Sequence, residues 1–177
     1  MKLSEHIILG GGAALALAPT LGARGSLVFW ASSVLIDVDH HWDYVYRNGF
    51  RDWSPAGMFA YHERMFAQIH RPDFLAMNLF HTAEWFLLVA CAMLWQGSAI
   101  LFAVLLGMVF HLTLDLLRLA RHQAVFSRAL SLVEYWIRRR MLVRRGLDPD
   151  RAFADALAAV GRGPRRGGFL RRLPQDS

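Results

Sequence analysis

Four stretches of the chain are almost wholly apolar, and they fall into two pairs. The first pair lies at 7–18 and 26–36, on either side of a turn that contains Pro and Gly. The second pair lies at 77–95 and 98–120, joined by a tight Gln-Gly-Ser turn. The second pair approaches the roughly twenty residues that cross a bilayer core, whereas the first pair, of about twelve residues each, would cross only beside longer neighbours. The pattern predicts an all-α, integral membrane four-helix bundle made of two hairpins.

Polar segments follow each hairpin. The insert at 37–72 is rich in aromatic residues, His and Arg, and Ser54 followed by Pro55 is typical of a helix start. We expect the amphipathic helix that follows to lie along the membrane surface. After the second hairpin, apolar residues at helical spacing predict an interfacial helix within 125–143, and a later Asp-Pro-Asp motif predicts a short helix through Ala159.

The predicted organisation has three parts. Residues 1–122 form a membrane-embedded metal-site domain, 123–160 form basic interfacial or cytoplasmic helices, and 161–177, rich in Gly, Arg and Pro, form a disordered tail. A cleaved signal peptide is the alternative for the first apolar stretch, but Glu5 and His6 fit the positive leading region of such a peptide poorly.

The net charge of +6 comes mainly from arginines in the insert and the tail, whereas the opposite turns carry only Arg24. Basic residues beside membrane spans are retained on the cytoplasmic side. We therefore expect a multi-pass protein of the cell inner membrane, with both termini cytoplasmic and arginines in contact with membrane lipid. No motif or pattern of stacking aromatics accompanies the arginines, so no specific nucleic-acid partner is expected. The single Cys91 excludes an internal disulfide framework.

A small set of carboxylates and imidazoles interrupts the apolar stretches. Such groups are costly inside apolar segments, so they are functional candidates by default. The predicted topology brings all of them to the cytoplasmic ends of the helices. They are His6, Asp37, Asp39, His40, His81, Glu84, His111 and Asp115.

Two spacings favour a metal site. His111 and Asp115, four residues apart, share a helix face, so both can reach one cation, or the carboxylate can orient the imidazole. Asp37 and Asp39 directly follow an apolar run, and carboxylates so close repel each other unless a cation or protons compensate. Simpler interpretations stay open, namely a buried His–Asp hydrogen bond and solvated aspartates at a helix end. Mixed oxygen and imidazole ligands suit zinc, manganese or iron, as one or two divalent ions.

Glu84 and His40 are the candidates for catalytic proton transfer. Glu84 lies three residues after His81 on the same face, where it is a ligand, a general base or a partner of a tail arginine. Divalent ions held by this set of residues could activate water and clamp the oxygens of a phosphate ester. The sequence therefore predicts a metal-dependent hydrolase that cleaves a small-molecule or lipid phosphoester at the membrane surface.

Three motifs carry a resemblance to a known family. They are Ile36-Asp37-Val38-Asp39-His40, His70-Arg71 with Phe80-His81-Thr82, and the run from Gly107 to Asp115 with its Gly-x3-His-x3-Asp pattern. Over residues 1–120 the chain resembles the membrane-bound metal-dependent hydrolase family, small bacterial inner-membrane proteins similar in motif to zinc-dependent phospholipase C. It departs from the family at Ile36, where proline is common, and at Thr82, where serine is common. The resemblance implies metal ligands at His6, Asp37, Asp39, His70, His81, His111 and Asp115, with Arg71 contacting the substrate phosphate.

Two non-enzymatic functions are the alternatives. A haem-binding electron carrier would use His6, His81 and His111 as axial ligands, although haem needs none of the clustered aspartates. A structural or ion-handling membrane protein would use the same polar residues for packing or to line a pathway. Visible absorption separates the first alternative from a hydrolase, and metal analysis separates the second.

Overall fold

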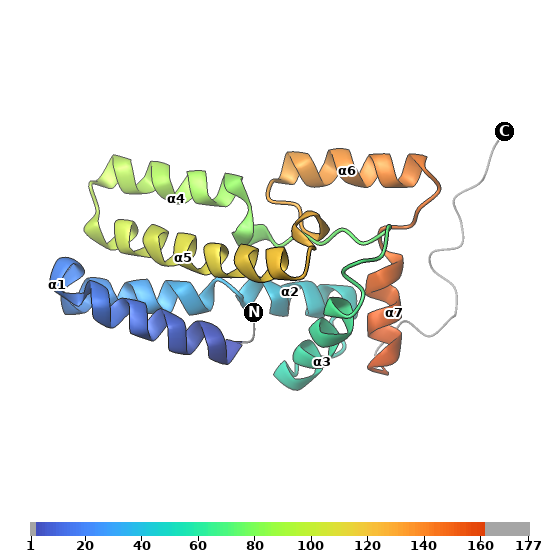
Figure 1. Ribbon diagram of the computed structural model, residues 1–177, viewed down its shortest axis with the longest axis horizontal. Helices are drawn as coiled ribbons and strands as arrows, with labels where there is room; N and C mark the ends of the chain where they lie inside the picture. Colours follow the sequence, from blue (N-terminus) through green and yellow to red (C-terminus); the bar gives the residue numbers. More distant parts are fainter. Residues whose placement is uncertain (1–2, 162–177) are drawn as a thin grey trace.

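The computed structural model describes residues 3–161, and all the regular elements in that range are helical, as predicted. The elements in chain order are α1 (Leu3–Leu35), α2 (Val38–Arg47), α3 (Pro55–Phe66), the short 3-10 helix η1 (Leu79–His81), α4 (Ala83–Gln96), α5 (Ala99–Arg121), η2 (Val125–Ser127), α6 (Leu132–Arg144) and α7 (Arg151–Ala159). Figure 1 shows α1, α4 and α5 side by side, with α3 and α7 beyond one end of this group.

Helix α1 consists of two arms that fold back on each other at Gly22. This residue has φ 66° and ψ 170°, a backbone conformation that glycine adopts without steric cost. The indole Nε1 of Trp30 donates a hydrogen bond to the carbonyl oxygen of Ile7 at 3.1 Å. In an uninterrupted helix these residues would lie about 35 Å apart along the axis. The chain therefore reverses within the turn that the sequence predicts between 18 and 26 (Figure 1).

Two glycines allow the helices around this reversal to approach closely. A Cβ on Gly10 would overlap the Ser33 hydroxyl on the opposite arm of α1. A Cβ on Gly107, in α5, would overlap the Ser32 hydroxyl and the Phe29 carbonyl oxygen of α1. Small residues at such positions let backbones pack closely. The two arms of α1 and the middle of α5 thus form a tightly packed group of three helical segments.

Two segments are long and apolar enough to cross a membrane, judged by length and composition. They are Leu3–Arg47, which includes both arms of α1 together with α2, and Ala99–Arg121. The third apolar stretch was predicted to be helical from residue 77, but α4 begins only at Ala83. Thr82 caps this helix by accepting a hydrogen bond from the Trp85 amide. As a result α4 is a shorter apolar helix.

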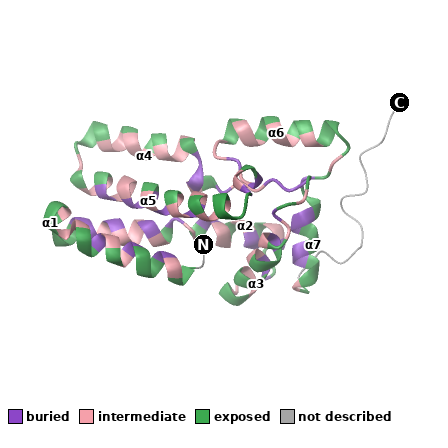
Figure 2. Ribbon diagram, viewed as in Figure 1, coloured by how far each residue is buried: buried purple, intermediate pink, exposed green. Residues whose placement is uncertain are grey.

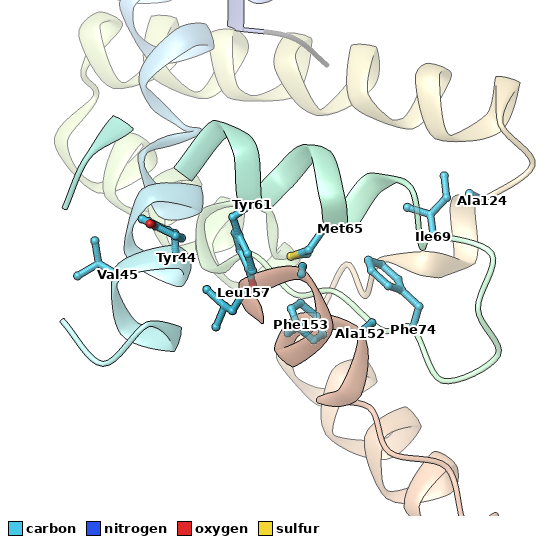
Figure 3. Close-up of a cluster of buried hydrophobic side chains, with 11 residues drawn as sticks. Tyr44, Val45, Tyr61, Met65, Ile69, Phe74, Ala124, Ala152, Phe153 and Leu157 are labelled. Carbon is cyan, nitrogen blue, oxygen red and sulfur yellow. The ribbon is translucent and has the colours of Figure 1, made fainter. Parts of the chain in front are cut away.

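The insert and the tail share a hydrophobic core of their own. Figure 3 shows this cluster, in which side chains from α2, α3 and α7 meet. Its largest members include Tyr44, Tyr61, Met65, Phe74, Phe153 and Leu157. Helix α3 begins as predicted, with the Ser54 hydroxyl accepting from the Gly57 amide and Pro55 in the first position. Its apolar face packs partly into this protein core, so the contacts cross the domain boundary predicted at 122/123.

The tail helices differ in detail from the prediction. The helix expected within 125–143 begins at Leu132, because the Ser131 hydroxyl caps it by accepting from the amides of Val133 and Glu134. In Figure 1 this helix, α6, runs roughly parallel to α4. Helix α7 follows the Asp-Pro-Asp motif and ends at Ala159, as predicted. The disordered tail predicted for 161–177 lies, from residue 162 on, outside the described residues.

Candidate metal centre

The structure brings together four candidate residues from three separate segments of the chain. Asp37 lies at the joint between α1 and α2, His81 ends η1, and His111 and Asp115 lie one helical turn apart in α5. The two imidazoles are completely buried and the Asp115 side chain is 5% exposed. Each of these four residues offers one ligand atom within 4.8 Å of the others. They form the centre of the candidate site.

One carboxylate oxygen, Asp37 Oδ1, is surrounded by imidazole nitrogens. It lies 3.1 Å from His40 Nε2, 3.2 Å from His111 Nε2 and 3.5 Å from His81 Nε2. Although this oxygen is buried, none of these approaches has the geometry of a hydrogen bond. Buried charged groups are paired or coordinate metals, so this carboxylate oxygen is a candidate metal ligand.

The proton positions of two imidazoles follow from the outer partners of their rings. His111 Nδ1 lies 2.7 Å from the Ser33 carbonyl oxygen, which can only accept a hydrogen bond, so Nδ1 is the donor. His81 Nδ1 lies 3.1 Å from Asp39 Oδ2, which accepts in the same way when ionised. In the neutral form of each ring the Nε2 atom therefore carries a lone pair, and the two Nε2 atoms face each other at 3.2 Å. Two lone pairs at this distance repel unless a proton or a metal ion lies between them.

The spacing of these atoms fits a metal of zinc's size. Ligands at 2.0–2.1 Å from a tetrahedral zinc lie about 3.3 Å from one another. The two Nε2 atoms are 3.2 Å apart, and Asp37 Oδ1 lies 3.5 Å from that of His81 and 3.2 Å from that of His111. Asp115 Oδ2 lies 3.7 Å from His111 Nε2, close enough to be a fourth candidate ligand. Two imidazoles and two carboxylates thus match the donor set predicted from the sequence.

Asp39 lies behind the ring of His81, where a carboxylate commonly orients a metal-binding histidine. Its Oδ2 accepts hydrogen bonds from the Phe80 amide at 2.9 Å and from His81 Nδ1 at 3.1 Å. A carboxylate behind a ligating imidazole sets the ring's tautomer and orientation. Its other oxygen, Oδ1, is buried without a hydrogen-bond partner. Asp39 also belongs, with Asp37, His40 and His81, to a second group whose ligand atoms lie within 4.8 Å of one another.

His6 lies beside the centre but in neither of these groups. Its ring stacks on His111 with centroids 3.8 Å apart and an angle of 15° between the planes. Its Nε2 lies 3.3 Å from Asp115 Oδ1 and 4.0 Å from Asp37 Oδ2. Both ring nitrogens are buried without a hydrogen-bond partner. The close packing at Gly10 and Gly107, each one turn from one of these rings, accounts for the stacking.

His40 lies at the more accessible edge of the site, where its side chain is 20% exposed. Its Nδ1 pairs at 3.0 Å with the Asn78 side-chain amide, so Nε2 faces Asp37. His62 packs edge-on against the ring and donates to the His40 carbonyl oxygen at 3.0 Å. Burial, reinforced by the charge of His40, lowers the pKa of His62 to about 3. His62 is therefore neutral and holds His40 in place.

Three residues predicted for the site lie elsewhere. Glu84 accepts hydrogen bonds from the Ser131 hydroxyl at 2.6 Å and the Leu132 amide at 3.0 Å, so it anchors the start of α6. Arg71 pairs with Asp73 at 2.7 Å and with Asp155 at 2.8 Å, which ties the insert to α7. These hydrogen bonds raise the pKa of Arg71. His70 is exposed on the same loop. None of the three belongs to either group of converging ligand atoms.

Sequence reasoning missed one charged residue at the site, Arg128. Its Nη1 donates to Asp115 Oδ2 at 3.0 Å, and its side chain is only 11% exposed. Nothing in the sequence separates Arg128 from the many other arginines of the tail, because its position depends on how the segment after α5 folds back. The supporting contacts of Ser33 and Asn78 were missed for the same reason.

Comparisons with protein-family models, with curated proteins and with solved structures found no match to this chain. The case for a function therefore rests on the geometry of the site and on the motifs of the sequence.

Proposed function

We propose that the protein is a membrane-bound metal-dependent hydrolase that cleaves a phosphoester at the cytoplasmic face of the inner membrane. One observation carries the proposal. The Nε2 atoms of His81 and His111 and the Oδ1 atom of Asp37, which accepts no hydrogen bond, converge in a buried site at separations typical of ligands on one metal ion. The resemblance to the membrane-bound metal-dependent hydrolase family supports the same conclusion.

The metal that best fits the site is zinc, with manganese or iron as alternatives. Two imidazoles and two carboxylates suit any of these ions, and the tetrahedral spacing favours zinc. When bound, such an ion lowers the pKa of a water molecule and polarises a phosphoryl oxygen. The second group of ligand atoms, around Asp39 and His40, leaves room in the proposal for a second ion.

The residues around the ion have separate roles. Asp37, His81, His111 and Asp115 hold it, and Asp39 orients the ring of His81 through Nδ1. His40 is the proposed proton-transfer residue, because at 20% exposure it is far more accessible than the buried rings of His81 and His111. A group that exchanges protons with solvent and substrate needs this accessibility.

The surface of the helices supports a membrane location. Large apolar side chains are exposed on α1, α4 and α5, and Figure 2 shows the exposed positions along these helices. They include Ile8, Leu15, Leu27, Leu87, Leu94 and Trp95. Exposed apolar side chains in this number suit lipid rather than water. Arginines of the insert and tail lie beyond the same end of the helices as the site, which favours a cytoplasmic site and cytoplasmic termini.

The haem-binding alternative is less compatible with this geometry. In a bis-histidine haem, the macrocycle lies between two rings that approach the iron from opposite faces. His81 and His111 Nε2 are 3.2 Å apart, and His6 stacks directly on His111, which leaves no room for a macrocycle between any two of these rings.

Metal analysis of the purified full-length protein in detergent tests the proposal. We expect bound zinc in the wild type, its loss in Asp37→Ala and His111→Ala, and its retention in His122→Ala, an exposed histidine outside the site. Hydrolysis of p-nitrophenyl phosphate and bis(p-nitrophenyl) phosphate should follow the metal content. A wild type without metal would refute the site. Full metal content without hydrolysis of either ester or of lipid phosphoesters would favour the structural or ion-handling alternative.

A further inference from the structure

Arg128 is a nearly buried cation in direct contact with the candidate metal centre. Its Nη1 donates a hydrogen bond to Asp115 Oδ2 at 3.0 Å, and the two side chains are 11% and 5% exposed. The same Asp115 oxygen lies 3.7 Å from His111 Nε2. A single carboxylate therefore connects the guanidinium to the proposed ligands of the ion.

The backbone around Arg128 is held in place by specific contacts. The Ala76 amide donates to the Ser127 carbonyl at 2.8 Å, and the Ala129 amide donates to the Ala76 carbonyl at 2.9 Å. On the other side, Arg138 donates to the carbonyl oxygens of Phe126 and Arg128, the latter at 3.4 Å. The segment thus pairs with the chain just before η1, which carries His81. A pre-organised arginine costs less entropy when it binds a ligand.

Arg128 supplies a positive charge beside the three carboxylates of the site. Asp37, Asp39 and Asp115 together carry three negative charges, of which one divalent ion neutralises two. The remaining negative charge would repel an anionic ligand from the ion. Arg128 cancels this charge, and a second ion would make the site positive. With a single ion bound, the guanidinium therefore lets an anion approach a neutral rather than a negative centre.

The guanidinium also has donors left for a ligand. It carries five N–H groups in a planar fork that matches carboxylate and phosphate oxygens. Its Nη1 bonds to Asp115, while its Nε and Nη2 form no hydrogen bond with the residues that the structure describes. Arg71, by contrast, uses Nε, Nη1 and Nη2 on neighbouring side chains.

We propose that Arg128 binds the phosphoryl oxygens of the ligand beside the metal ion, with Asp115 holding the guanidinium in position. This inference rests on the proposed function and specifies its ligand, a phosphate group presented either by a soluble ester or by a lipid headgroup. Arg128 thereby takes the role that the family resemblance assigned to Arg71.

Phosphate titration of the zinc-loaded, full-length protein in an uncharged detergent tests the inference. The variants are Arg128→Gln, Arg128→Lys and, as a matched control, Arg47→Gln. Arg47 is also a mostly buried arginine paired with an aspartate. It lies away from the candidate site, over the ring of Phe153 in the hydrophobic core that the insert and the tail share. Zinc content and inorganic phosphate affinity are measured on each sample. We expect Arg128→Gln to weaken phosphate binding about tenfold or more, as for loss of a charge-assisted hydrogen bond. The phosphate affinity of Arg128→Lys should lie between those of Arg128→Gln and the wild type. The zinc content should be the same in all the variants and the wild type.

The outcomes separate this inference from the proposed function. A wild type that holds zinc but binds no phosphate would overturn the role of Arg128 and leave the metal site standing. Unchanged phosphate affinity in Arg128→Gln would also overturn the inference. Zinc loss in Arg128→Lys would overturn it as well, because it would show that Arg128 only holds Asp115 in place. A wild type that holds no zinc would overturn the proposed function itself.

A second arm identifies the source of the phosphate. The same variants are placed in phosphatidylcholine nanodiscs with and without phosphatidic acid, in the absence of free phosphate. Arg128-dependent binding of phosphatidic acid supports the inference with a lipid headgroup as ligand. Arg128-dependent binding of inorganic phosphate alone supports it with a soluble phosphoester.

Discussion

The close approach of α5 to α1 at Gly107 should control both stability and metal affinity. In Gly107→Ala the new Cβ would lie 3.2 Å from the Phe29 carbonyl carbon and closer still to its oxygen. Because Phe29 contributes backbone here, relief requires the helices to separate by on the order of 1 Å. Overpacking of this kind costs about 1–3 kcal/mol, against a gain of up to about 1 kcal/mol in helix propensity.

The control for this substitution is Gly12→Ala, because a Cβ on Gly12 meets nothing within 4 Å. Both variants gain the same helix propensity, so the difference between them isolates the overpacking cost of about 1–3 kcal/mol. Unfolding is followed by circular dichroism in detergent with a chelator present, so that bound metal does not contribute.

Zinc affinity gives a second measurement on the same pair. His111 lies one turn after Gly107, and a shift of on the order of 1 Å exceeds the tolerance of about 0.2 Å for metal–ligand distances. We expect Gly107→Ala to bind zinc more weakly than Gly12→Ala. Equal unfolding free energies and equal zinc affinities in the two variants would refute the packing argument.

Three further predictions concern residues around the site. Asp39→Asn should lower zinc affinity about 10–100-fold in a competition titration, because the amide orients the His81 ring less well; wild-type affinity would show that Asp39 does not act through His81. Glu84→Gln should lower the thermal midpoint of unfolding without changing the zinc content, because the Glu84 carboxylate anchors the start of α6. Zinc loss in this variant would show that Glu84 contributes to the metal site. Arg71→Gln should leave zinc and phosphate binding unchanged and cost less than about 1 kcal/mol at neutral pH. The hydrogen bonds from Arg71 hold the pKa of Asp73 below its usual value, so the stability they add is present above that value and lost as the pH falls. Denaturant unfolding below pH 5 should therefore bring wild type and Arg71→Gln closer together, and a constant gap would contradict this reasoning.

Several elements of the fold followed directly from local sequence. Ser54-Pro55 starts α3 as predicted, and the chain reverses at Gly22 within the predicted turn. Local signals suffice there because a cap or a positive φ involves only neighbouring residues. The start of α4 was predicted six residues too early. Residues 77–82 are apolar enough for a helix, but Ala76 and Ala83 on either side of them bond to the segment that carries Arg128, and the Phe80 amide bonds to Asp39.

The candidate site shows the same division between local and long-range information. The apolar pattern and the cost of burying charge singled out Asp37, Asp39, His81, His111 and Asp115 without any structure. The sequence alone therefore determined the helical class, the positions of the apolar stretches and the residue types of a metal centre. The tertiary structure decided which carboxylate lies among the imidazole nitrogens of the candidate site and which one lies behind a histidine. It also decided the placement of Arg128 rather than Arg71 at the centre. These contacts join residues far apart in the chain, and they depend on how closely whole helices pack, which the pattern of polar and apolar residues along each helix does not specify.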